Sequence, residues 1–461
     1  MNKNNLIKLS AVLIVIIVVA AVYFFKSSNK SYDYLLFSEV TDAGEVVSKA
    51  IINYPNNMKP VDVDKDTYTV NAKSYIQAGA KKDQLYYDTN RNIVKIEITN
   101  NQVILYFDES EGSTLTWLDE GRNFPAKLEY TITQNKPVTL ENSSSKKSVI
   151  ENGKYVWDNK VVNEELAKFE SVIQDGKINY QFYNAGESDK LIIWFHGNGE
   201  GDFNKSGNNV AQIKANRGGV AWVSDEAQEI FGKAHVAAFQ VPDTWYYAEK
   251  DNILELVYNE INSIVDKYGI DKNKIVVSGC SAGGYMTTRM IIKYPDLFAS
   301  AMIICPALDV ATARGGRTPT AEELDAITNS RTSIWLVQSE TDGTVNTEEC
   351  SKRMFYTLSK GQNITTTRIE QEINADYTTY ETPDNKYKLS LYDTVDKELI
   401  KDSLGAERFA GKLEVSEDYD QDGVYTAVKY NDHFSWIFTL NNNPKSSDGT
   451  QIMNWASSFV K

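Results

Sequence analysis

The sequence of 461 residues contains only three cysteines, three histidines and ten prolines. So few cysteines exclude a disulfide scaffold and argue against a structural zinc site. The low proline content, with 26 glycines, excludes a collagen-like or proline-rich chain. A formal net charge of −15 argues against a general nucleic-acid binder, because phosphate binding needs clustered lysine and arginine. An enzyme using a histidine base would have only His196, His235 and His433 available.

Apolar material is plentiful. Hydrophobic residues make up 42% of the chain and aromatic residues 11%, which is enough for packed cores and excludes disorder of the whole chain. The length fits two or three domains.

The first 30 residues predict export. The stretch from Leu9 to Phe25 is uncharged and almost wholly apolar, and lysines flank it on both sides. A helix needs about 17 to 20 such residues to cross a bilayer. We therefore expect residues 1–30 to form an N-terminal transmembrane anchor, with a cleaved signal peptide as the alternative. Under the first interpretation the protein is a single-pass protein of the cell membrane with residues 31–461 outside; under the second it is secreted.

Residues 31–150 are expected to form an all-β domain. Short runs alternate apolar and polar side chains, and turn residues separate them. Several short strands in this length favour a sandwich of the immunoglobulin type. The polar stretch at 142–147 is interpreted as a linker. The clearest runs lie at 67–70, 94–98, 103–107 and 128–132.

From residue 151 to 461 the pattern changes to strands alternating with helices. Continuous apolar runs predict strands buried on both faces. Residues 252–268 carry a helical apolar stripe between two of these runs. The alternation predicts a parallel sheet covered by helices, an α/β fold. The runs lie at 191–195, 274–278, 301–305 and 333–337.

The most specific motif is Gly279-Cys280-Ser281-Ala282-Gly283-Gly284, which fits G-x-S-x-G between a buried strand and a helix. The flanking glycines permit a tight turn that presents Ser281 as a nucleophile. The backbone N–H of Ala282, at the start of the helix, can face a developing oxyanion. Cys280 is expected in the buried flank of this turn rather than as the nucleophile.

A second glycine-rich loop, residues 196–201, directly follows the buried strand at 191–195. Its backbone N–H groups can approach a substrate carbonyl, and either Asn198 or Gly199 is the expected donor. His196 is interpreted as a hydrogen-bonding brace of this loop rather than as the base.

The remaining catalytic groups are expected later in the chain. Asp342 lies in a short loop after the strand at 333–337 and is the expected acid, with Glu340 and Asp309 as alternatives. His433 is the expected base, because His235 lies in an apolar strand and is interpreted as a core residue. The order serine, aspartate, histidine is that of α/β-hydrolases. No cofactor is expected.

Residues from about 165 to 461 resemble α/β-hydrolases of the prolyl-oligopeptidase type, which grade into polyhydroxybutyrate-depolymerase-like and feruloyl-type esterases. Residues 31–150 are similar to the immunoglobulin-like domain that precedes such esterases. The resemblance implies Ser281, Asp342 and His433 as a catalytic triad and the 196–201 loop as the oxyanion hole. The motifs that carry it are His196–Gly201, Gln240–Trp245, Gly279–Met286, Tyr294–Ala299 and His433–Trp436.

The resemblance also implies that the segment from Gln240 to Trp245 is a wall of the substrate pocket, with core packing as the alternative for Trp245. Four further residues are expected around this pocket: His196, Glu200, Cys280 and Trp436.

Two features depart from the family pattern. Gln338-Ser339 stands where related proteins have His-Gly. Residues 365–430 are expected to form a β-rich insertion that caps the pocket. Within it, Asp418, Asp420 and Asp422 resemble half of a calcium loop, although an acidic turn without metal is the favoured interpretation because Lys429 replaces the final glutamate.

The sequence therefore predicts a serine hydrolase that cleaves esters or peptides. An ester is preferred as the substrate. A peptidase of this type needs an acidic group to hold a peptide amine, and no residue of the sequence can be assigned to that role. The alternatives are a serine peptidase of the prolyl-oligopeptidase type and a non-catalytic surface protein on a hydrolase scaffold. The expected partners are the substrate and the membrane; the sequence leaves the oligomeric state open.

Overall fold

The computed structural model describes residues 31–109, 111–372, 374–395, 413–415 and 428–461. The anchor predicted at residues 1–30 lies outside this part of the chain, as do the calcium candidates Asp418, Asp420 and Asp422. Of the helices that are described, none combines the length and the apolar character that a bilayer crossing requires.

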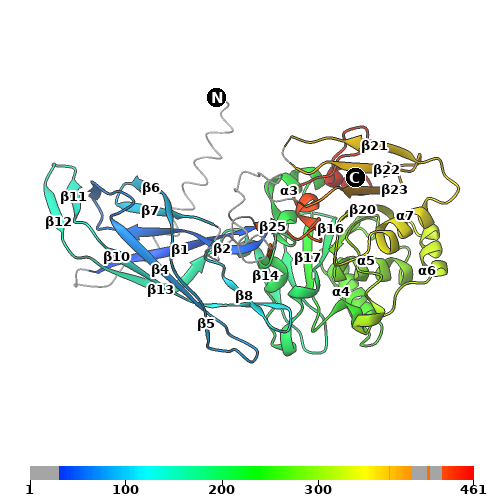
Figure 1. The fold of residues 1–461 in the computed structure, drawn as a ribbon, viewed down its shortest axis with the longest axis horizontal. Coiled ribbons are helices and arrows are strands. Elements are labelled where there is room, and N and C mark those ends of the chain that lie inside the picture. The colour runs from blue at the N-terminus through cyan, green and yellow to red at the C-terminus, as the bar shows by residue number, and fades with distance from the viewer. Residues whose placement is uncertain (1–30, 110, 373, 396–412, 416–427) are drawn as a thin grey trace.

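The N-terminal half is built from β-sheets that lie beside the α/β half (Figure 1). The largest has the order β13-β1-β2-β7-β6 and comprises β1 (Ser31–Thr41), β2 (Gly44–Asn53), β6 (Ile93–Thr99), β7 (Gln102–Phe107) and β13 (Lys154–Val162). A second has the order β10-β4-β5, from β4 (Tyr68–Tyr75), β5 (Leu85–Asn90) and β10 (Lys127–Gln134). A third contains β3 (Met58–Val61), β11 (Val138–Asn142) and β12 (Lys147–Ile150), and a separate hairpin pairs β8 (Leu115–Leu118) with β9 (Arg122–Pro125).

Alternation of side chains explains why these strands pack as a sandwich. Along β4, buried residues alternate with half-buried ones, because successive side chains of a strand point to opposite faces. The inward residues of several strands join one apolar cluster that includes Tyr34, Val47, Val70 and Leu105. The predicted β-rich N-terminal domain is confirmed.

This domain extends past the boundary expected at residue 150. Residues 142–147 are the turn of the β11–β12 hairpin rather than a linker. Asn142 Oδ1 accepts hydrogen bonds from the backbone N–H groups of Ser144 (3.0 Å) and Lys146 (2.9 Å), so the polar residues form an ordered turn. Strand β13 then returns and pairs in parallel with β1.

The second half is organised around a sheet of the order β14-β15-β17-β16-β18-β19-β20-β23-β22-β21. Its central strands are parallel: β16 (Leu191–Phe195), β17 (His235–Gln240), β18 (Ile275–Cys280), β19 (Ser300–Ile304), β20 (Ser333–Ser339) and β23 (Tyr387–Tyr392). Antiparallel strands close both edges: β14 (Phe169–Val172), β15 (Asn179–Tyr183), β21 (Thr365–Ile369) and β22 (Tyr377–Glu381).

Helices cover both faces of this sheet. Along β16, Ile193 and Phe195 pack in one apolar cluster and Ile192 and Trp194 in another, so its continuous apolar run serves two cores. The first face is covered by α4 (Ile253–Tyr268), α5 (Ala282–Lys293), α6 (Ala321–Ala326) and α7 (Arg353–Leu358). The second is covered by α2 (Ala211–Lys214), α3 (Asp225–Phe231), α8 (Trp436–Leu440) and α9 (Ile452–Ser458). The predicted α/β architecture is confirmed.

The stretch expected to be a separate insertion at 365–430 differs from that expectation. Its first part forms β21, β22 and β23 of the main sheet, and β23 is buried along its whole length. Trp335 of β20 donates from Nε1 to Ser390 Oγ of β23 at 2.9 Å, a contact that joins the two strands. Further along, β24 (Leu413–Val415) pairs with β25 (Val428–Tyr430).

Polar contacts dock the two halves against each other. Glu45, buried at the start of β2, forms an ion pair of 2.8 Å with Lys214 of α2. Arg122 of β9 forms an ion pair of 3.2 Å with Asp243. The N-terminal domain is therefore held in a defined position beside the carboxyl ends of the parallel strands.

Candidate active site

The G-x-S-x-G motif forms a sharp turn between β18 and α5. Ser281 has φ 54° and ψ −117°, a backbone conformation that side-chain-bearing residues rarely adopt. A Cβ on Gly279 would lie 2.5 Å from the carbonyl oxygen of Gly283, and one on Gly283 would overlap the carbonyl oxygen of Phe195. Backbone atoms close the space at both glycines, so the motif is required by the packing of the turn.

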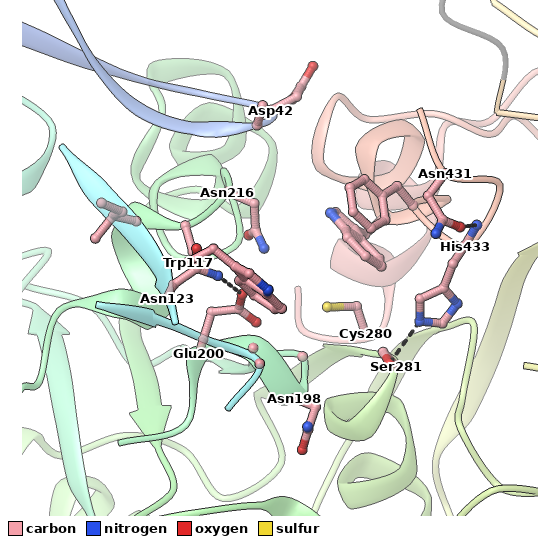
Figure 2. A pocket seen from close by; sticks show the side chains of 18 of the residues that line it. Asp42, Trp117, Asn123, Asn198, Glu200, Asn216, Cys280, Ser281, Asn431 and His433 are labelled. Atoms are coloured by element: carbon pink, nitrogen blue, oxygen red, sulfur yellow. Dashed lines mark hydrogen bonds between the residues drawn. The ribbon is translucent and has the colours of Figure 1, made fainter. Parts of the chain in front are cut away.

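The three residues predicted as a triad come together. The His433 ring lies with Nε2 2.9 Å from Ser281 Oγ and Nδ1 2.8 Å from Asp342 Oδ2 (Figure 2 shows the first contact). Only 6% of His433 and 9% of Asp342 is exposed, so the contact between these two residues is shielded from water. This is the arrangement in which an imidazole can accept a hydroxyl proton while a carboxylate holds its other nitrogen.

Hydrogen bonds orient the acid. Asp342 Oδ1 accepts from the backbone N–H groups of Thr344 and Val345, each at 2.9 Å. Oδ2 accepts from Gln338 Nε2 at 3.2 Å in addition to His433. Gln338, one of the departures from the family pattern, therefore contacts the triad directly.

The alternative residues lie elsewhere. Glu340 forms an ion pair of 2.9 Å with Lys352, and Asp309 accepts from the backbone N–H of Asn346 at 3.1 Å. His235 is buried in β17 and stacks on Phe182 with ring centroids 5.7 Å apart. It is a core residue, as expected.

The surroundings of His433 change its proton affinity. Burial opposes the charged imidazole, but the neighbouring sulfur of Cys305 and the carboxylate of Asp342 outweigh it and raise the pKa of His433.

Ligand atoms of Cys305, Asp342 and His433 lie within 4.8 Å of one another, a donor set that could also hold a metal ion. Cys305 was not identified from the sequence, where it appears only as the end of an apolar strand.

The glycine-rich loop after β16 begins a short 3-10 helix, η2 (Asn198–Glu200). The first N–H groups of a helix have no acceptor within it, so the amides of Asn198 and Gly199 and that of Ala282 at the start of α5 are suited to an oxyanion. The side chain of Asn198 is held by Thr244, whose Oγ1 donates to Asn198 Oδ1 at 2.7 Å.

His196 braces this loop from behind, as expected. Its Nε2 accepts from the backbone N–H of Val241 at 3.2 Å, and its carbonyl oxygen accepts from Trp245 Nε1 at 3.0 Å. Burial lowers the pKa of His196 to about 3, so the ring is neutral.

Three of the residues expected around the pocket do not line it. His196, Gln240 and Trp245 are buried beneath the loop, and Gln240 Nε2 donates to the carbonyl oxygen of Glu200 at 2.9 Å. The loop that follows β16 covers the end of β17. The segment from Gln240 to Trp245 therefore supports this loop from below and does not form a wall of the cavity. In contrast, Glu200, Cys280 and Trp436 line the cavity.

Ser281 opens into a cavity of about 810 Å³ that lies between the two domains. Part of its wall comes from the N-terminal domain: Asp42, Tyr86, Tyr87, Trp117, Glu120 and Asn123. Figure 2 shows Trp117, Asn123 and Glu200 across the pocket from Ser281 and His433. None of the lining residues from the N-terminal domain was predicted from the sequence, because they precede the nucleophile by more than 150 positions and belong to no motif.

Comparisons with known proteins agree with this architecture. Residues 242–333, which contain the nucleophile turn, match the sequence model of the prolyl oligopeptidase family, and residues 33–147 match that of the esterase Ig-like N-terminal domain. Acetylxylan esterase A of Aspergillus awamori is 40% identical over 47 residues, which are 10% of this chain. The chain spans only 16% of the length of that curated relative.

Among solved structures, a thermostable esterase is 20% identical, with a TM-score of 0.59 over 90% of this chain and 97% of that one. An acetyl xylan esterase from Aspergillus awamori is 17% identical, with a TM-score of 0.34 over 49% of this chain and 92% of that one. The first likeness covers both domains and shows that the fold is shared. The resemblance predicted from the sequence is confirmed. The match to the prolyl oligopeptidase family supports the predicted class, a serine hydrolase.

Proposed function

We propose that this protein hydrolyses carboxylic esters through a covalent acyl-enzyme on Ser281. The observation that carries the proposal is the single imidazole of His433, placed 2.9 Å from the Ser281 hydroxyl and 2.8 Å from the Asp342 carboxylate.

In the first half of the reaction Ser281 Oγ attacks the ester carbonyl carbon while its proton passes to His433 Nε2. Asp342 accepts the Nδ1–H bond and stabilises the imidazolium that forms. The carbonyl oxygen becomes an oxyanion, held by the N–H of Ala282 and by that of Asn198 or Gly199. The C–O bond to the alcohol then breaks, and His433 returns the proton to the leaving oxygen.

The second half repeats these steps with water. Water replaces the alcohol, gives a proton to His433 Nε2 and attacks the acyl carbon. The Ser281 ester bond breaks, Ser281 recovers its proton, and the carboxylic acid leaves. Each proton that His433 accepts is thus returned in the same half-reaction.

Ester hydrolysis is preferred because residues 33–147 match an esterase Ig-like domain and this domain contributes a wall of the pocket. Peptide hydrolysis is the second candidate, since residues 242–333 match the prolyl oligopeptidase family. Matched substrates that differ only in ester against amide linkage separate the two. A higher kcat/KM for the ester is expected, and efficient cleavage of the amide alone would favour the peptidase.

A fluorophosphonate probe tests the activated serine directly on the full chain. The parent protein should be labelled, and Ser281→Ala and His433→Ala should not. Ser278→Ala is a matched control, because Ser278 is fully buried in β18 and its hydroxyl has no hydrogen-bond partner among the described residues. This control should be labelled like the parent. A folded parent that is never labelled would instead support a non-catalytic binding protein.

We also propose that the protein is exported and held in the cell membrane by its first 30 residues. The support is the uncharged apolar run from Leu9 to Phe25 with lysines on both sides. In fractionated cells the full chain should remain with membranes after alkaline carbonate washing and should be degraded by protease added outside. Release by the wash or protection from the protease would contradict the proposal.

A further inference from the structure

Exposed aromatic side chains line the N-terminal wall of the cavity. Trp117 on β8 is 51% exposed and Tyr86 on β5 is 41% exposed, and both face the cavity into which Ser281 opens. The two are neighbours, since the backbone N–H of Trp117 donates a hydrogen bond of 3.4 Å to Tyr86 Oη. Large aromatic surfaces left in water beside a reactive serine are typical of ligand contacts.

The β8–β9 hairpin that carries Trp117 is fixed against the α/β domain. A Cβ on Gly199 would lie 2.9 Å from Trp117 Cζ3, so the indole approaches the oxyanion loop closely only because residue 199 is glycine. Asn123 Nδ2 donates to Glu200 Oε1 at 2.9 Å across the domain boundary. The aromatic wall therefore keeps its place without a ligand, which lowers the cost of binding one.

Charge in the cavity is predominantly negative. Four carboxylates line it, those of Asp42, Glu111, Glu120 and Glu200, against one guanidinium, that of Arg314. Two of these carboxylates also face arginines outside the lining: Asp42 lies 3.9 Å from Arg217 and Glu111 lies 4.0 Å from Arg91. Arg314 belongs to the α/β side, where it lies over the ring of Tyr246 at 5.7 Å. Glu120 belongs to the N-terminal wall with Trp117, and Glu200, 8% exposed, lies beneath that indole (Figure 2).

We propose that this wall binds a positively charged ammonium group on the part of the ester remote from the scissile bond, with Trp117 and Tyr86 facing the cation and Glu120 and Glu200 supplying the opposite charge. The inference rests on the proposed ester hydrolysis. Aromatic faces attract cations through their ring quadrupole. The buried carboxylate of Glu200 and the exposed one of Glu120 add to that attraction, Glu200 more strongly because less water screens it. An anionic ester is disfavoured by the same carboxylates.

Isosteric substrates test the proposal on the full chain. Acetylthiocholine carries a trimethylammonium group, and the thioacetate with a tert-butyl group in its place has nearly the same shape without the charge. We expect kcat/KM to be at least about tenfold higher for the cationic substrate, which corresponds to about a tenfold difference in affinity. This preference should shrink at high salt, because ions screen the charges. Equal kcat/KM values would overturn the proposal.

Variants assign the preference to the wall. Glu200→Gln and Trp117→Leu should each lower kcat/KM for acetylthiocholine severalfold more than for the neutral thioacetate. Asp119→Asn is the matched control: it removes one negative charge beside Glu120, but Asp119 is paired with Lys81 at 2.9 Å and does not line this cavity. It should leave the ratio of the two substrates unchanged. A ratio unaffected by Glu200→Gln and Trp117→Leu would also contradict the proposal.

A binding measurement keeps this inference separate from the catalytic one. Calorimetry on Ser281→Ala should detect a heat of binding for tetramethylammonium chloride but none for sodium chloride at the same concentration. Adding Trp117→Leu to the Ser281→Ala protein should remove this heat of binding. If neither thioacetate is hydrolysed but the cation binds, ester hydrolysis fails and the cation site stands. If the neutral thioacetate is hydrolysed and tetramethylammonium does not bind, only the cation site fails.

Discussion

The side-chain amide of Gln338 donates a hydrogen bond of 3.2 Å to Asp342 Oδ2, the same oxygen that accepts His433 Nδ1. Gln338 Nε2 also donates to the carbonyl oxygen of Val345 at 3.0 Å, which ties the acid loop to the end of β20. A glutamine that departs from the family pattern is thus a positioning residue for the acid.

Replacing Gln338 with leucine should lower kcat about tenfold with little change in KM, because one hydrogen bond to the carboxylate is lost and the loop is less well held. Steady-state kinetics on one ester would measure this. Gln338→Glu should be worse than leucine, since it places a second acid against Asp342. Unchanged kcat in a folded Gln338→Leu protein would remove Gln338 from the mechanism.

The raised pKa of His433 predicts the pH profile. The base must be neutral to accept the Ser281 proton, so kcat/KM should rise with pH and its acid limb should have a midpoint above 6.5. Asp342→Asn removes the charge that favours the imidazolium, so this limb should move to lower pH while the rate falls roughly 10³–10⁴-fold. Asp309→Asn should do neither. An acid limb that stays in place in Asp342→Asn would contradict the assignment.

Glu45 should couple domain docking to pH. Burial favours its neutral form, but the ion pair with Lys214 and hydrogen bonds from Ser38 and Thr114 outweigh this and hold the pKa of Glu45 below 4.5. Its stabilising effect is therefore present above pH 4.5 and is lost as pH falls through the lowered pKa.

Glu45→Gln should accordingly destabilise the protein by about 3 kcal/mol at pH 7, because it leaves Lys214 without its buried partner. Thermal unfolding at pH 7 and below pH 4.5 would measure it, and the difference from the parent should shrink at the lower pH. Glu39→Gln, an exposed acid on β1, should leave the melting temperature nearly unchanged. A deficit that is constant with pH would show that the Glu45 charge is not the cause.

Gly283→Ala should destabilise the protein by about 3 kcal/mol or prevent soluble expression, because a Cβ there overlaps the carbonyl oxygen of Phe195 and the central sheet cannot yield. Gly343→Ala is the matched control, since a Cβ at that position has no atom within 4 Å. Melting temperatures of the two variants give the comparison. A Gly283→Ala protein as stable as Gly343→Ala would mean that the turn relaxes.

Local patterns were sufficient for the parts of the site that lie next to strong secondary-structure signals. Ser281 and the 196–201 loop each follow a continuous apolar strand, and such strands end at one edge of a parallel sheet. Local patterns failed where pairing is set by distant strands. Residues 365–392 alternate like a separate β-domain, yet β23 is buried beside β20, and the polar run at 142–147 is a hairpin turn rather than a linker.

The sequence by itself determined the chemistry of the nucleophile, because glycine at 279 and 283 and serine at 281 are dictated by a turn only a few residues long. Because the chain has three histidines, the catalytic base could be chosen by comparing only these three residues. The tertiary structure alone decided that Gln338 holds the acid and that Trp117, Asn123 and Glu200 meet across the domain boundary. Contacts between distant segments depend on how two packed domains dock, and no spacing along the chain encodes that geometry.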